Sequence, residues 1–379
     1  MAARSRRTRS ARQRTRRYIG ILVLVVALFV GWSWFWHYAA GQAQIAIDGW
    51  RAREAKAGRV YACGSQTIGG YPFRIEVECD KASASFRSNQ PPVEIKAGGM
   101  SIVAQIYQPT LLITEFHGPL TIADPGKPPN IVVNWKLAQS SVRGTPAAPE
   151  RVSLVFDKPV VERIAGGNRQ NVLRAAHVEI HGRLVEGSVT KNPVIETVLR
   201  LTQASAPELH PAASQPVDAD ITAVLRGLDN FAPKPWAARF RELQAAGGRI
   251  DITKARVQQG QTIAVGNGAL SLSASGHLQG QLRVTVAALE PFLASINAPQ
   301  AVQASPDMDK IAGALDRLVP GLGGVARQQT TSSNLSFGIN LLGERTTLEG
   351  KPAVTLPLRF DDGSIFLGPI KIGNAPSLF

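Results

Sequence analysis

The chain has 379 residues, of which 44% are hydrophobic and 18% charged, so it carries enough apolar material for a core and is not a disordered chain. Its formal net charge of +14 would be compatible with nucleic-acid binding, but residues 1–17 hold eight arginines and no acid. The other 362 residues carry 34 bases and 28 acids, a net of +6, so the basic character comes partly from one tail and we expect no nucleic-acid partner.

Residues 18–36 form an uncharged apolar segment directly after this tail. As a helix they would span about 28 Å, close to the ~30 Å hydrocarbon core of a bilayer. Trp32, Trp34 and Trp36 lie at one end of the segment, and such rings prefer the membrane–water interface. Arginines before the span favour a cytoplasmic tail at 1–17. The sequence therefore predicts a single-pass protein of the inner membrane, with the bulk of the chain in the periplasm.

A cleaved signal peptide is the competing interpretation, with Ala39-Ala40-Gly41 as its cleavage site. Against it, the apolar segment is long and ends in three tryptophans. Residues 37–60 then predict a helical stalk that continues the membrane helix and ends near Gly58.

The two cysteines, Cys63 and Cys79, both follow the anchor. In an oxidising compartment they are expected to form a disulfide, which would close a loop of about 15 residues. Two free buried thiols are the alternative.

From residue 61 onward the hydrophobic period changes to two, which is typical of half-buried strands. In residues 73–80, for example, apolar and charged side chains alternate strictly. Similar runs return throughout the chain, separated by turns, and few helices intervene. The pattern predicts a mainly β fold over 61–379, a meander-like antiparallel sheet that is either curved or closed into a sandwich, with a few short helices.

A Pro/Ala/Ser-rich stretch at 205–218 and a helix beginning near Pro235 interrupt the strands. They predict two lobes, 61–204 and 249–379, joined by a linker and helical insertion at 205–248. A further short helix is expected at 306–320 and a strand at 335–341.

No sequence motif for a hydrolase, a nucleotide-binding loop or a metalloprotease occurs in the chain. His177, Glu179 and His181 would share one face of a strand, but residues i and i+4 lie about 13 Å apart, too far for one metal ion. We interpret them as a solvated face, and Asp361-Asp362-Gly363 as a hairpin turn. No enzyme activity, catalytic residue, metal or cofactor is therefore expected.

The one-sided strands must cover their apolar face. The sheet can close on itself around a core, or it can curl into an open groove whose floor is covered by lipid, and aliphatic residues suit both. The alternating side chains Val354, Leu356, Leu358 and Phe360 are the candidate groove lining.

GGYPFRIEVEC at 69–79 and LPLRFDDGSIFLGPIKIG at 356–373, together with the arginine-rich start and the apolar span, carry a resemblance. The layout resembles an alphaproteobacterial family of single-pass envelope proteins known as domain of unknown function 2125. An anchor followed by long β-meanders is also similar in architecture to AsmA-type envelope proteins, which are implicated in phospholipid movement.

These observations favour a noncatalytic protein that binds or handles lipid or another hydrophobic envelope component. The expected partners are the membrane, a phospholipid ligand and other envelope proteins. The alternative is an envelope scaffold or assembly protein that binds other proteins and has no lipid ligand.

Overall fold

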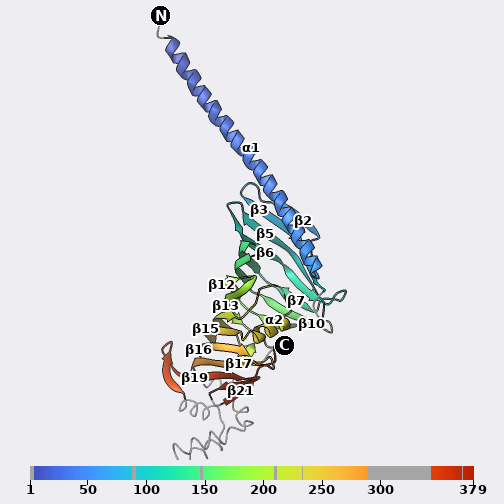
Figure 1. Ribbon diagram of the computed structural model, residues 1–379, viewed down its shortest axis with the longest axis vertical. Helices are drawn as coiled ribbons and strands as arrows, with labels where there is room; N and C mark the ends of the chain where they lie inside the picture. Colours follow the sequence, from blue (N-terminus) through green and yellow to red (C-terminus); the bar gives the residue numbers. More distant parts are fainter. Residues whose placement is uncertain are drawn as a thin grey trace, which may run out of the picture.

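The computed structural model describes residues 4–87, 91–145, 148–208, 211–232, 234–288, 343–368 and 370–379 (Figure 1). The helix expected at 306–320 and the strand expected at 335–341 lie outside these ranges.

Helix α1 (Arg4–Lys56) is one unbroken element of 53 residues, which corresponds to a length of about 80 Å. It joins the apolar span to the predicted stalk without a kink, and it is long and apolar enough to cross a membrane. Gly58 ends the helix in the left-handed region, with φ of 79°, a conformation that glycine adopts without steric cost.

The rest of the described chain is mainly strands. Their bounds are β1 (Arg59–Ala62), β2 (Ser65–Gly69), β3 (Arg74–Asp80), β4 (Ser83–Phe86), β5 (Val93–Gln105), β6 (Gln108–Ala123), β7 (Ile131–Asn134), β8 (Leu137–Thr145), β9 (Ala148–Asp157), β10 (Val160–Ala165), β11 (Asn168–Arg174), β12 (His177–Ser188), β13 (Lys191–Ala204), β14 (Val217–Arg226), β15 (Arg249–Gln259), β16 (Thr262–Leu272), β17 (Leu278–Ala287), β18 (Glu344–Leu348), β19 (Lys351–Asp361), β20 (Ser364–Leu367) and β21 (Ile370–Asn374). Helix α2 (Trp236–Ala245) and a short 3-10 helix (Pro211–Ser214) complete the described elements.

All strands belong to one open antiparallel sheet, and the predicted meander is confirmed. Five pairs of short strands, such as β7 and β8 or β9 and β10, are successive halves of one bent strand. With each pair counted as one strand, each strand up to β16 hydrogen-bonds to the next strand in sequence, whereas β17 pairs with β19, and β18 lies on the other edge of β19. The strands follow one another along the long axis of the molecule, from β3 beside α1 to β21 at the far end (Figure 1). The sheet is therefore built by local pairing, with few long-range closures.

The bends of successive strands lie next to one another and form a crease across the part of the sheet nearest α1. Backbone hydrogen bonds connect them from strand to strand: Gly64 N to Asp80 O, Lys81 N to Gly98 O, Lys136 N to Asp157 O, Lys158 N to Ala176 O, and Ala176 N to Thr202 O, all between 2.7 and 2.9 Å. Lys81, Lys158 and Gln203 have positive φ values of 48–51° at this line. Such bulges bend a sheet and shift the phase of its side-chain alternation.

The prediction that residues 205–248 interrupt the strands is wrong in one respect. Strand β14 lies within it and pairs with both β13 and β15, so the sheet continues and is not divided into two lobes at this point. The alternating Val217, Ala219, Ile221, Ala223 and Leu225 specify this strand, and the neighbouring proline- and serine-rich residues obscured the pattern.

Helix α2 packs on the sheet after β14. Leu243 of the helix is buried with Leu228 and Leu272, and the chain terminus, Leu378 and Phe379, covers the same cluster. The turn predicted at Asp361-Asp362-Gly363 joins β19 to β20, with positive φ at both Asp362 and Gly363. Both observations agree with the local sequence signals.

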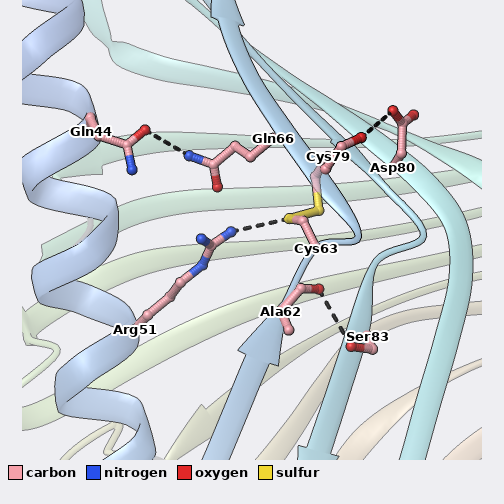
Figure 2. The surroundings of a disulfide bond; sticks show 9 residues. Gln44, Arg51, Ala62, Cys63, Gln66, Cys79, Asp80 and Ser83 are labelled. Atoms are coloured by element: carbon pink, nitrogen blue, oxygen red, sulfur yellow. Dashed lines mark hydrogen bonds between the residues drawn. A yellow bond between two sulfur atoms is a disulfide. The ribbon is translucent and has the colours of Figure 1, made fainter.

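Cys63 and Cys79 form the predicted disulfide, with their Cα atoms 5.4 Å apart. The bond joins the link between β1 and β2 to the end of β3, next to the crease. Arg51 of α1 donates a hydrogen bond to Cys63 Sγ at 3.1 Å, and Gln66 donates to Gln44 of α1 at 2.9 Å (Figure 2). The bridge therefore lies where the stalk meets the first strands.

Replacing Cys79 with serine should lower the free energy of unfolding by about 3 kcal/mol, because the reduced chain regains the entropy of a loop of about 15 residues. Chemical denaturation of the full chain in detergent would measure the loss. An alkylation assay that finds two free thiols in the wild-type protein would contradict this assignment.

Candidate functional site

One row of directly paired side chains runs across twelve strands of the sheet. In strand order it comprises Val77, Ile102, Thr114, Ser140, Leu154, Ile180, Leu199, Ile221, Ala255, Gly266, Val284 and Leu356. Directly paired residues of an antiparallel sheet point to the same side. Ten of the twelve are nonpolar, so this side of the sheet, here called the apolar face, extends over eleven strand spacings, or about 53 Å.

The adjacent row of pairs points to the other side of the same strands. It comprises Glu78, Ser101, Glu115, Gln139, Val155, Glu179, Arg200, Asp220, Arg256, Val265, Thr285 and Thr355. Ten of these residues are polar or charged, and we call this side the polar face. The strands are therefore amphipathic in the same sense along the whole sheet.

A bulge in β15 preserves this arrangement where a regular strand would break it. Ile252 and Ala255 are three residues apart, so in an unbroken strand they would point to opposite sides. Because the register shifts between them, Ile252 pairs with Ala223 and Ala255 pairs with Ile221, both on the apolar face. The bulge keeps the apolar side chains together.

The apolar face has an open hollow of about 410 Å³ on strands β9, β12 and β13. Its lining is almost wholly apolar and includes Val152, Leu154, Ile180, Leu184, Ile195, Phe231 and Trp236. Val152 and Ile180, which lie on its floor, are 41% and 40% exposed, and no second sheet layer covers them in the described chain. Aliphatic side chains on a sheet interior are usually covered.

Gly182 accounts for the depth of the hollow. It pairs with Val152 and Thr197 on the apolar face, and a Cβ built on it would meet no heavy atom within 4 Å. A glycine inside a strand often marks a place where another molecule approaches the backbone closely. The hollow is therefore space that a side chain at position 182 would fill.

The candidate groove residues Val354, Leu356, Leu358 and Phe360 do lie on the apolar face, in β19. Val354 and Leu356 are only 5% and 2% exposed, and Leu358 and Phe360 are half-buried. They pair with Val286, Val284, Leu282 and Gly280 of β17. The open part of the face lies instead at β9, β12 and β13, and the signal that could have located it is the glycine that interrupts the apolar residues of β12.

His177, Glu179 and His181 share the polar face of β12, as predicted. Glu179 accepts from the two imidazoles at 3.0 Å each and from Arg200 at 2.9 Å. His181, His177 and Arg200, in that order, lower the pKa of Glu179 to about 2. Asp157, with its carboxylate 2.5 Å from Nδ1, and then Glu179 raise the pKa of His177. Among the residues that the structure describes, no group of three His, Cys, Asp or Glu side chains is arranged to hold a metal ion.

This network predicts how stability depends on pH. The folded pKa of His177 lies above its ordinary 6.5, so its contribution is complete below pH 6.5 and is lost as the pH rises through the folded value. Glu179 has a folded pKa of about 2 against an ordinary 4.5, so its contribution is present above pH 4.5 and is lost as the pH falls towards 2.

Substituting His177→Gln should flatten the fall in stability on the alkaline side of pH 6.5, because the group that loses its proton there is gone. Denaturation midpoints of wild-type and variant protein, measured at a series of pH values, would show it. Parallel profiles for the two proteins would exclude this role of His177.

The fold is thus that of a mainly β protein in which a helix long enough to span a membrane precedes an open antiparallel sheet with one apolar face. The chain belongs to a bacterial family described as "uncharacterized protein conserved in bacteria", domain of unknown function 2125, whose model matches residues 36–376. The match begins at the end of the apolar span and covers all the described strands of the sheet. No curated protein matches the chain.

Proposed function

We propose that this protein is a noncatalytic envelope protein, anchored in the inner membrane, whose periplasmic apolar face binds the acyl chains of phospholipids or another hydrophobic envelope component. The observation that carries the proposal is the apolar face itself, which extends from β3 beside α1 for about 53 Å and is open at the Gly182 hollow. A large apolar surface that is left open in water generally marks a binding site.

The degree of burial supports a groove over a closed core. All ten residues of β14, on both faces, are half-buried, as expected when no second layer covers the strand completely. At the hollow, Val152 and Ile180 are 41% and 40% exposed. An acyl chain would cover these side chains without requiring any hydrogen-bonding partner, because both surfaces are hydrocarbon.

The other features of the chain fit an envelope location. Arginines precede the span and few follow it closely, which favours an N-terminus in the cytoplasm. A disulfide persists in an oxidising compartment such as the periplasm. The expected likeness to AsmA-type envelope proteins is architectural only and adds no argument for function.

One observation favours the second candidate, an envelope scaffold. Phe231 and Trp236, at the rim of the hollow, are 53% and 77% exposed. Large exposed aromatic side chains are frequent anchors in protein–protein interfaces. A protein segment inserted in the hollow would cover the same residues as a lipid would.

Gly182→Leu tests the lipid proposal, because the new side chain enters open space and should fill the hollow without strain. The full chain is reconstituted in vesicles that contain a phospholipid with a photoreactive diazirine in its acyl chain. After illumination, wild-type protein should carry lipid adducts on peptides of β9, β12 and β13. The hollow lies five strand spacings, about 24 Å, along the sheet from β3, so such adducts would report lipid that has left the bilayer. In the variant these adducts should be lost.

Two controls accompany this experiment. Adducts within residues 18–36 should be equal in both proteins, since that segment contacts the bilayer directly. Gly69→Leu in β2 also places a leucine in open space, but Gly69 pairs with Glu76 of β3 on the polar face. This variant should leave the β9–β13 adducts unchanged. Wild-type protein with adducts only in 18–36 would refute lipid binding and favour the scaffold.

Reporter fusions test the orientation. Alkaline phosphatase fused after Phe379 should be active, and a reporter that functions only in the cytoplasm should be inactive at the same position. The opposite pair of activities would overturn the periplasmic assignment.

A further inference from the structure

The tip of the β2–β3 hairpin is attached to α1 inside the predicted membrane span. Trp32 Nε1 donates to Pro72 O at 2.9 Å, and the Ser33 and Tyr71 hydroxyls lie 2.8 Å apart. Trp32 and Ser33 precede the end of the span at Trp36 by about one helical turn, or roughly 5–6 Å. The tip is therefore level with the last turn of the span.

Trp32 and Trp36, about one turn apart on the helix, both contact the tip of the hairpin. The Phe73 ring lies 6.2 Å from Trp32, and the Tyr71 ring lies 5.6 Å from Trp36, measured between centroids. Trp36 Nε1 donates to Arg74 O at 2.9 Å, so the first charged residue of β3 is level with the end of the span. Arg74 is paired with Glu76 at 2.9 Å, farther along the strand. Aromatic residues of the tip therefore lie at or before the end of the span and the first charged residue lies at its end, which fits the polarity of a bilayer interface.

The tip of the β5–β6 hairpin lies beside the first tip. Ile106 N donates to Phe73 O at 3.1 Å, and the next residue is Tyr107. Phe73 and Tyr107 are 64% and 75% exposed, and Tyr71 is 42% exposed. Three exposed aromatic side chains therefore gather at one end of the sheet, beside the helix segment that is itself exposed along its apolar length. Aromatic rings are stabilised at the level of lipid headgroups.

We propose that the tips of the β2–β3 and β5–β6 hairpins enter the interfacial layer of the leaflet in which the α1 span ends, so that the apolar face opens directly into the bilayer. Ile75 of β3 and Ala104 of β5, which pair on the apolar face, lie two residues from Phe73 and Ile106. The face thus begins where the tips end, and a hydrocarbon chain could pass from bilayer to sheet without crossing water. This route for a hydrocarbon chain extends the proposed lipid-binding function and depends on it. Entry of the tips into the interfacial layer depends only on their contacts with α1.

Depth measurements on the full chain test this geometry. Phe73→Cys and Tyr107→Cys are made separately and labelled with a thiol-reactive, environment-sensitive fluorophore, since both native cysteines are held in the disulfide. The protein is reconstituted in phosphatidylcholine–phosphatidylglycerol vesicles, with or without a phospholipid that carries a nitroxide near the top of its acyl chain. Nitroxide lipid should reduce the emission from both labels.

Asn267→Cys is the matched control, because Asn267 is exposed on β16, far along the sheet from β3. Its emission should not change with nitroxide lipid. The insertion would be overturned if nitroxide lipid left the emission at positions 73 and 107 unchanged, as at position 267. The Cys63–Cys79 bond must be intact in the proteins compared. Quenching at the tips without acyl adducts at β9–β13 would retain the insertion and reject the proposed lipid function, so the two failures are distinguishable.

Discussion

The structure depends on one constraint: the apolar side chains of successive strands must remain in register on a single side of an open sheet. A shift of one residue in any strand would move its apolar set to the polar face. The rows through Ile180 and through Glu179 show that register is kept across twelve strands. Bulges at the crease and in β15 maintain it wherever the backbone bends. Salt bridges such as Lys254–Asp220 on the polar face add cross-strand pairs of opposite charge.

This constraint explains why the sheet is a meander. Most strands pair with their neighbours in sequence, so the turn between them sets the register locally. The pairing of β17 with β19 is the longer-range exception among the described strands. An open sheet, however, leaves its apolar face without a second layer. Helix α2 and the chain terminus cover the face near Leu272, while the region around Gly182 stays open. The hollow therefore exists because no other segment covers this region and because Gly182 has no side chain.

The end of the sheet beside α1 is organised by a different set of contacts. Two tryptophan indoles donate to backbone carbonyls of the first hairpin, Arg51 donates to the disulfide, and the disulfide lies at the first bend of the crease. These contacts orient the first strands relative to α1, and strand pairing transmits that orientation along the sheet. A helix that spans a bilayer would therefore hold the beginning of the apolar face at the membrane surface, which is the arrangement that a lipid-binding function would need.

Composition and pattern alone determined several features. The uncharged stretch at 18–36 specifies a long apolar helix, the period of two specifies strands, and the short spacings between them specify an antiparallel meander. The position of Cys63 and Cys79 after the anchor indicated their disulfide. These features could be predicted because each depends on residues close together in the chain. Strand β14 was missed although its alternation is regular, because the proline-rich residues before it suggested a linker.

Only the tertiary structure decided which part of the apolar face is open. The alternation at Val354 to Phe360 and that at Val152 to Leu154 look equivalent as sequence, yet Leu356 is 2% exposed and Val152 is 41% exposed. The exposed fraction of a side chain depends on whether other segments of the chain pack over it. Those contacts join residues that are distant in sequence. The contact of Trp32 with the hairpin tip forty residues later is equally invisible in a local pattern. Local periodicity determines which side of a strand is apolar, whereas only the folded chain determines whether that side is covered.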